Sequence, residues 1–364
     1  MKTAALKTLV ALASASFLSQ PAMAQAGFTT LYNFTNGIPT GLTLANGGLY
    51  GAYAGGEPGG YGCGNIFFLQ PPGTGGGAWT ETILYTFADT NDACGPAFGP
   101  IIGPGGVLYG VTVVGGANGG GVLYELKPPV SPGGAWTESV LYSFSPGEIA
   151  VGQLVPAPDG SFYEVNDSGV VQLQPPTTSG GAWTAVWLQS IPDGPTSIAR
   201  GPDGSLYVTT ISGPTTTKGA ILQLIPPASP GGDWTQTAIY SLADMGQGGF
   251  LNSLAVGRDG TLYGTTFGTT SVFGEAEATV FELTPPASSG GDWTYTMLEN
   301  FGAGHVLDPP LILRGGRLFA AIVGLQDAVF ALTPPSAAGN AWTLNSFTTL
   351  PARRAASRSS VAHK

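Results

Sequence analysis

Few side chains in this sequence are suited to catalysis. Histidine occurs only at positions 305 and 363, and His363 lies in a basic C-terminal tail, so His305, close to Asp308, is the one candidate base. A hydrolase triad needs a nucleophile that is activated by an oriented base, and the chain contains no Gly-x-Ser-x-Gly motif. We therefore predict no catalytic residue and keep His305 as a candidate ligand-binding residue.

Carboxylates are the next candidates for chemistry. Ten of them fall in or near segments that we interpret below as loops of variable length: Glu57, Asp89, Asp92, Glu148, Asp167, Asp193, Asp244, Glu275, Glu277 and Asp308. Calcium requires several oxygen ligands, but none of these spacings resembles an EF-hand or another calcium loop. We favour a solvated acidic rim and predict no cofactor, with calcium as the alternative.

The two ends of the chain differ from its middle. Residues 1–24 combine Lys2 and Lys7 with an apolar run and an Ala-Met-Ala site, which predicts a signal peptide cleaved after Ala24. Residues 25–350 hold all 22 acidic residues and only six basic ones, a net charge of −16. This acidic body disfavours binding to nucleic acid or to anionic membranes. Residues 351–364 are basic and aperiodic, which predicts a disordered tail.

The body is one unit repeated along the chain. A tryptophan follows the first proline of a Pro-Pro pair by eight residues in every copy: Trp79, Trp136, Trp183, Trp234, Trp293 and Trp342. The units are 47 to 59 residues apart, so a constant core carries loops of different length. Each tryptophan is expected to pack between neighbouring units.

Four short strands are predicted in each unit. An apolar strand leads into a Gly-Gly or Asp-Gly turn, as in Ser253–Gly260, and a Leu-Tyr strand follows. A third strand runs to the Pro-Pro pair, and a fourth begins at the tryptophan. Four antiparallel strands in about 50 residues are typical of a propeller blade. We therefore predict an all-β, six-bladed β-propeller over residues 25–350, with seven blades as the alternative.

Ring closure has a candidate segment. Phe28–Phe34 is a seventh copy of the fourth strand and is expected to pair with the last blade. Such pairing would cover an edge strand that otherwise invites aggregation.

Alternating strand directions sort the loops onto two faces of the ring. Asp-Gly turns and Pro-Pro corners of nearly constant length share one face, called here the constant face. Loops of variable length share the other, called the variable face, where function on repeat folds usually lies. Cys63 and Cys94 both fall on the variable face, in adjacent blades, and an even pair in an exported chain predicts a disulfide. Exposed aromatic residues there are candidates for ligand binding: Tyr61, Phe98, Phe250, Phe267 and Phe273.

The repeat resembles that of the "choice-of-anchor tandem repeat GloVer-containing" proteins. The resemblance rests on Trp-Thr-x-x-x-Leu-Tyr-x-Phe, Asp-Gly-x-Leu-Tyr-Gly-x-Thr and Val-Phe-x-Leu-x-Pro-Pro, and covers residues 27–350. It implies a secreted bacterial repeat protein, often attached to the surface, although no hydrophobic anchor follows Leu350 here. More distantly, the Asp-Gly-x-Leu-Tyr element is similar to six-bladed NHL-type and lactonase-like propellers.

Three functions remain open from the sequence. We predict a secreted, monomeric, non-enzymatic propeller at the cell envelope or outside the cell, which binds a protein or glycan ligand on its variable face. A lactonase- or lyase-like enzyme is the alternative, and a purely structural envelope component is the third. Exposed aromatic side chains on the variable face favour the binding protein, whereas an enzyme would show buried polar residues at the channel mouth.

Overall fold

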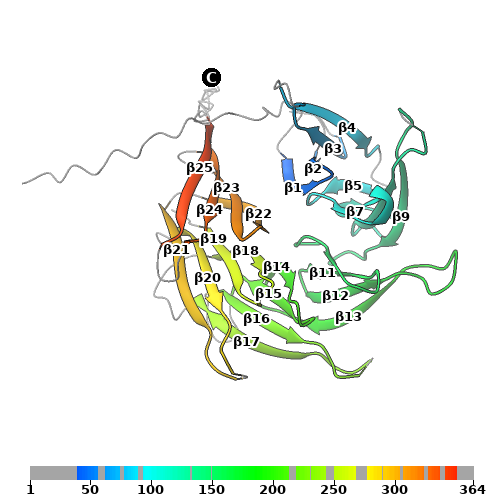
Figure 1. Cartoon of the computed structure of the whole chain (residues 1–364). Helices are drawn as coiled ribbons and strands as arrows, with labels where there is room; N and C mark the ends of the chain where they lie inside the picture. The colour runs from blue at the N-terminus through cyan, green and yellow to red at the C-terminus, as the bar shows by residue number, and fades with distance from the viewer. Residues whose placement is uncertain are drawn as a thin grey trace, which may run out of the picture.

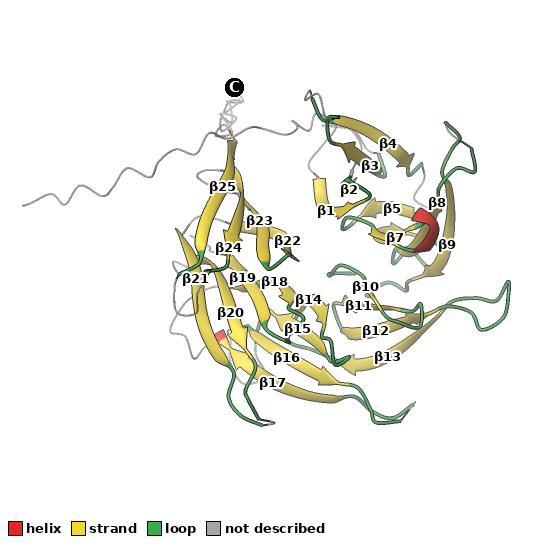
Figure 2. Ribbon diagram, viewed as in Figure 1, coloured by secondary structure: helices red, strands yellow, loops and turns green. Residues whose placement is uncertain are grey.

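Six antiparallel sheets, five of four strands and one of five, follow one another in chain order around a common centre in the computed structural model (Figure 1). The structure describes residues 39–55, 62–73, 78–88, 93–131, 133–148, 150–212, 219–229, 231–242, 250–267, 277–288, 290–303, 306–323, 327–336 and 341–350. Neighbouring strands within every sheet are antiparallel, and the first strand of each blade lies innermost (Figure 2). The predicted all-β, six-bladed β-propeller is confirmed.

Each blade is built from consecutive strands. Blade 1 contains β1 (Pro39–Ala45), β2 (Gly48–Tyr53), β3 (Asn65–Gln70) and β4 (Thr80–Thr86). Blade 2 contains β5 (Ala93–Pro96), β6 (Ile101–Ile102), a 3-10 turn (Pro104–Gly106), β7 (Leu108–Gly115), β8 (Val122–Lys127) and β9 (Thr137–Ser143). Blade 3 contains β10 (Val155–Pro156), β11 (Phe162–Asn166), β12 (Gly169–Gln174) and β13 (Thr184–Ser190).

The second half of the ring follows the same plan. Blade 4 contains β14 (Pro195–Arg200), β15 (Leu206–Thr210), β16 (Ala220–Ile225) and β17 (Thr235–Ser241). Blade 5 contains β18 (Phe250–Val256), β19 (Leu262–Phe267), β20 (Glu277–Thr284) and β21 (Thr294–Ala303). Blade 6 contains β22 (Val306–Arg314), β23 (Arg317–Val323), β24 (Asp327–Thr333) and β25 (Thr343–Leu350).

The Asp-Gly turns form as the sequence predicts. In blade 5, the Asp259 carboxylate accepts a hydrogen bond from the Thr261 amide at 3.1 Å, and the Gly257 amide donates to the Thr261 carbonyl at 2.7 Å. Gly260 adopts a φ of +85°, which favours glycine because it has no Cβ. Equivalent bonds join Asp203 to Ser205 in blade 4, so the turn is a repeated local structure.

The second and third strands of each blade are matched in side-chain size. Gly264 lies opposite Phe281 in the β19–β20 ladder, and the phenyl ring occupies the space that a Cβ on Gly264 would need. Blade 4 pairs Val208 with Leu222 at the same position, where no ring has to be accommodated. The residue after each Leu-Tyr pair is therefore selected by its partner across the ladder, as close packing of the core requires.

Tryptophans join consecutive blades. Trp293 of blade 5 lies edge-on to Tyr207 of blade 4, with ring centroids 6.0 Å apart at 76°. Trp234 meets Tyr163 of blade 3 in the same way, at 6.0 Å and 78°. Such edge-to-face pairs stabilise aromatic contacts beyond the burial of area. Packing of these tryptophans between blades, as predicted, is confirmed.

Two details differ from a uniform repeat. The innermost strand of blade 2 is divided into β5 and β6, which both pair with β7, and that of blade 3 is reduced to two residues plus an isolated bridge between Ala150 and Asn166. The predicted signal peptide, the closing segment Phe28–Phe34 and the tail 351–364 lie outside the described residues. Blade 6 completes its four strands with its own β25.

Candidate functional site

The innermost strands bulge at one level of the ring. In blades 1, 4 and 5 the ladder to the second strand skips one residue: Thr40, Thr196 and Asn252. In blade 6 it breaks between Asp308 and Ile312. All these irregularities lie toward the variable-face end of the strand, opposite the tight turns. A bulge redirects a side chain and leaves a residue outside the ladder, so the ring exposes polar groups to its axis here.

Hydrogen bonds from this level cross from blade to blade. The Thr40 hydroxyl lies 3.3 Å from the Pro96 carbonyl of blade 2, and the Thr196 hydroxyl lies 3.1 Å from the Leu251 carbonyl of blade 5. The Leu311 amide of blade 6 donates to the Ser253 hydroxyl at 3.0 Å. The last of these bonds satisfies a backbone group in the ladder break of blade 6, where Leu311 has no partner position on β23. All three bonds hold the innermost strands at fixed separations around the axis.

A cavity of about 130 Å³, called here the channel cavity, occupies the centre of this level. All six blades contribute to its wall: Gly41, Phe98, Gly99, Val151, Gly152, Gln153, Thr196, Ser197, Ile198, Asn252, Ser253, Leu254 and Leu311. None of the lining residues in the described part of the chain carries a titratable side chain. The cavity is therefore an uncharged site that offers hydroxyl, amide and backbone groups.

Glycines gather on one side of this cavity. Blades 1 to 3 contribute Gly41, Gly99 and Gly152 beside the side chains of Phe98, Val151 and Gln153. A Cβ on Gly41 would lie 2.7 Å from the Gly99 amide nitrogen, and one on Gly99 would lie 2.9 Å from the Gly41 carbonyl. Glycine at both positions lets these two segments come together, so the wall between blades 1 and 2 includes bare backbone.

The structure separates the predicted aromatic ligand-binding residues. Phe98 lies in the wall of the channel cavity, half-buried. Phe250 begins β18 and faces Phe267 across the β18–β19 ladder, two residues before Asn252. The remaining predicted residues, Tyr61, Phe273 and His305, lie outside the described residues. Among the predicted residues that the structure describes, Phe98 is the one found in the cavity wall.

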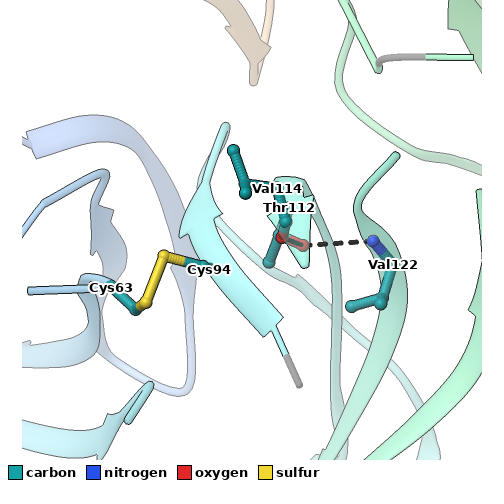
Figure 3. Close-up of a disulfide and its surroundings, with 5 residues drawn as sticks. All are labelled: Cys63, Cys94, Thr112, Val114 and Val122. Carbon is teal, nitrogen blue, oxygen red and sulfur yellow. Dashed lines mark hydrogen bonds between the residues drawn. A yellow bond between two sulfur atoms is a disulfide. The ribbon is translucent and has the colours of Figure 1, made fainter. Parts of the chain in front are cut away.

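The predicted disulfide is confirmed. Cys63 and Cys94 are joined, with Cα atoms 4.3 Å apart, and no other cysteine exists in the chain (Figure 3). The bond links the segment before β3 to the start of β5, so it ties blade 1 to the innermost strand of blade 2. Nearby, the Val122 amide donates to the Thr112 hydroxyl at 3.1 Å, which closes the loop between β7 and β8 (Figure 3).

Sequence reasoning missed the burial of Glu164. This residue of β11 has no exposed surface, and neither carboxyl oxygen has a hydrogen-bond partner among the residues that the structure describes. Burial raises the pKa of the Glu164 carboxyl well above its usual value, and the charges of Glu148 and Asp167 raise it further. The sequence signal was present: a glutamate follows Phe-Tyr where the other blades have Gly, Val or Ala. It lies opposite Val171, so it fills space that an aromatic ring takes in most other blades.

The described residues contain no group of three or more His, Cys, Asp or Glu side chains arranged to hold a metal ion. Several carboxylates of the acidic rim predicted from the sequence lie outside the described residues. None of the helices in the described part of the chain has the length and apolar character required to cross a bilayer.

No protein-family model and no curated protein matches this chain. Solved structures do. Virginiamycin B lyase from Staphylococcus aureus is 16% identical over 88% of this chain and 87% of its own, with a TM-score of 0.54. A candidate 6-phosphogluconolactonase from Bacteroides fragilis is 14% identical over 87% of this chain and 85% of its own, also with a TM-score of 0.54. At this identity the similarity shows the fold alone.

Proposed function

We propose that this protein is an exported, non-enzymatic binding protein that recognises a protein or glycan through its variable face. The channel cavity would hold one projecting group of that ligand. The supporting observation is the cavity itself, in which all six innermost strands meet and where Phe98 is the one predicted ligand-binding residue.

The size of the cavity favours a larger ligand over a small substrate. Sites that enclose a whole small molecule usually measure about 300 to 1,000 Å³. A volume of about 130 Å³ accommodates a single side chain or one substituent of a sugar. The rest of such a ligand would lie over the variable loops.

The chemistry of the wall fits the same proposal. Gln153, Ser197 and Asn252 offer hydrogen bonds without charge, and Phe98 adds an apolar surface. A neutral polar group of the ligand that is buried here would replace its hydrogen bonds to water by hydrogen bonds to the protein. The net gain in binding free energy is small, but a group that cannot form these bonds is penalised, so the site contributes to specificity more than to affinity. The lactonase- or lyase-like alternative would instead require an activated nucleophile or a metal ion.

Export is part of the proposal. Disulfides persist in oxidising compartments outside the cytoplasm, and Cys63 and Cys94 form one. With the signal peptide predicted from residues 1–24, this supports a secreted or envelope location, consistent with the resemblance to GloVer-repeat proteins.

Binding arrays test this function. The mature protein would be applied to a glycan array and to an array of short peptides, alongside the variants Phe98→Ala and Gln153→Ala. We expect each variant to lose roughly tenfold or more in affinity, the scale of one lost buried contact. A matched control is Val130→Ser, at a fully exposed position on the constant face, which should bind normally.

Two results would contradict the proposal. One is the absence of binding to either array by folded protein. The other is binding that neither cavity variant weakens. Turnover of a lactone probe such as gluconolactone, lost in the same variants, would transfer support to the enzyme alternative.

A further inference from the structure

A second and larger hollow lies on the constant face, between blades 4 and 5. It has a volume of about 880 Å³ and is bounded by the turns of both blades, by β17 and by the Pro-Pro corner before Trp293. No variable-face loop contributes to it. This inter-blade groove is therefore distinct from the channel cavity and lies on the face where the sequence predicted no function.

Aromatic side chains form one part of the groove. Tyr207, Tyr240 and Trp293 all line it. Tyr207 is buried, whereas Trp293 and Tyr240 are only half-buried. Trp293 packs edge-on against Tyr207, and this contact covers only part of its indole ring. The rest of the indole lines the groove. Partly exposed aromatic rings offer apolar surface to the C–H groups of a ligand.

Hydrogen-bonding groups form the other part. Asp203, Asp259 and Asp292 are exposed in the lining. The turns fix the first two, since Asp203 accepts from the Ser205 amide at 3.0 Å and Asp259 from the Thr261 amide at 3.1 Å. Each carboxylate keeps further lone pairs for a ligand hydroxyl.

The floor of the groove adds a neutral donor. Burial and the nearby charge of Asp203 raise the pKa of Tyr207 to about 12, so its hydroxyl keeps its proton at neutral pH. The Gln223 amide lies 3.4 Å from that hydroxyl. No lysine or arginine is among the lining residues that the structure describes. The groove thus presents acceptors and neutral donors, which suits a hydroxyl-rich ligand and disfavours an anionic one.

The preceding pair of blades repeats the same set of residues. At the junction of blades 3 and 4, Tyr163 and Gln172 correspond to Tyr207 and Gln223. Asp233 and Trp234 correspond there to Asp292 and Trp293. The ring geometry is the same, and Gln172 donates to the Ser161 hydroxyl as Gln223 does to Ser205. Arg200 contributes a positive charge near Asp159 and Tyr163, which distinguishes this second set of residues.

The acidic residue before the tryptophan is confined to these two blade junctions. In the other four blades an alanine precedes the tryptophan: Ala78, Ala135, Ala182 and Ala341. Two adjacent junctions with matching residues fit a ligand that itself repeats. We propose that the groove between blades 4 and 5 and the equivalent residues between blades 3 and 4 bind neighbouring segments of a neutral polysaccharide. A volume of about 880 Å³ falls within the range of ligand pockets and admits a short run of sugar units.

Alanine at the position before the tryptophan provides a variant that the fold already accepts. Binding of soluble β-glucan, mannan and xylan to the mature protein would be measured by calorimetry, with the acidic polymer alginate for comparison. We expect at least one neutral polymer to bind and alginate not to bind. Asp292→Ala should weaken that binding by roughly tenfold, as loss of a hydrogen bond to a charged group does. The double variant Asp233→Ala/Asp292→Ala should weaken it further, with an unchanged melting temperature.

Controls separate this proposal from the function proposed above. Phe98→Ala and Val130→Ser should both bind the polysaccharide normally. Loss of binding in Phe98→Ala would move the sugar to the channel cavity and overturn the inference. It is also overturned if no neutral polymer binds or if the double variant binds as well as the wild type. Binding of polylysine in place of sugar, with a steep dependence on salt, would instead identify the groove as a site for cationic peptides.

Discussion

Glu164 shows how one residue can depart from a repeat without disturbing the fold. An unpartnered carboxyl group in a protein interior is costly when charged, so it is held in the protonated form. Its oxygens have no hydrogen-bond partner even then. Blade 4 has Val208 at this position, with an aliphatic partner across the ladder as in blade 3. The site therefore tolerates an apolar residue, and the glutamate lowers stability at neutral pH.

Replacement of Glu164 should reveal this cost. Because the native pKa is higher than the unfolded one, the native state keeps a proton that the unfolded chain loses as pH rises above the ordinary carboxyl range. The free energy of unfolding should therefore fall with rising pH up to the native pKa, by at most about 1.4 kcal/mol per pH unit from this group. Glu164→Gln should abolish that fall, and Glu164→Val should raise stability at pH 7. Urea unfolding between pH 4 and pH 8 measures both.

A surface substitution is the control for this experiment. Asp233→Asn, at an exposed position, should leave the slope of stability against pH as in the wild type. An unchanged slope in Glu164→Gln would show that another group causes the pH dependence.

At the scale of the element, the hairpin of second and third strands is the unit of packing. Phe67, Tyr124 and Phe281 each lie over a glycine of the neighbouring strand. The ring fills the volume that the glycine leaves, so both residues are needed for close packing. A change on one strand therefore requires a compensating change on the other.

Blade 5 can be converted to the pairing of blade 4 as a test. Gly264→Val should destabilise the protein by about 3 kcal/mol or more, since overpacking forces the backbone or the Phe281 ring to move. Phe281→Leu alone should cost about 1–3 kcal/mol by leaving a cavity. The double variant, which reproduces the Val208–Leu222 pair, should recover much of the sum. Denaturant unfolding of the four proteins gives the coupling energy, and purely additive losses would refute the size matching.

The sequence predicted the elements well and the site poorly. Constant spacing from Pro-Pro to tryptophan and glycine in every tight turn predicted the blades, because these features are fixed by local backbone geometry. Thr196 carries no such signal, since a threonine that bulges toward the axis looks the same in sequence as one in a regular ladder. Burial of Glu164 depends on Val171, and the groove depends on residues that meet only when blades pack. Apart from the tryptophan packing and the disulfide, contacts between blades were therefore not predictable from local patterns.

For the whole molecule, the disulfide is the one covalent cross-link between blades besides the main chain. Cys63 and Cys94 are 31 positions apart, a span that includes β3, β4 and the passage from blade 1 to blade 2. A loop of this length restricts the unfolded chain by about 3–4 kcal/mol in the chain-entropy model.

Removal of the disulfide should thus lower stability without altering the ring. The double variant Cys63→Ala/Cys94→Ala is expected to unfold with about 3–4 kcal/mol less free energy and to keep the wild-type circular dichroism spectrum. Reduction of the wild type should give the same loss. A melting temperature unaffected by reduction would contradict this assignment.

The acidic body should also make stability depend on salt. Residues 25–350 carry a net charge of −16, and self-repulsion of this kind favours the expanded chain. Raising sodium chloride from about 20 to about 300 mM shortens the screening length below about 10 Å. The melting temperature at pH 7 should rise by a few degrees, and the rise should vanish near pH 4.5, the pI of the sequence. A fall with added salt at pH 7 would show that attractive charge pairs dominate instead.

Size matching between the second and third strands also limits how such a ring can evolve. Duplication or exchange of coding segments at the Pro-Pro corners moves the second and third strands together. Every aromatic side chain then stays opposite its glycine. A crossover between those strands would set Val208 against a phenylalanine or leave Gly264 against a leucine. Viable recombination points are therefore expected to cluster at the Pro-Pro corners. In proteins that share this repeat, the hairpin of second and third strands should be inherited as one unit.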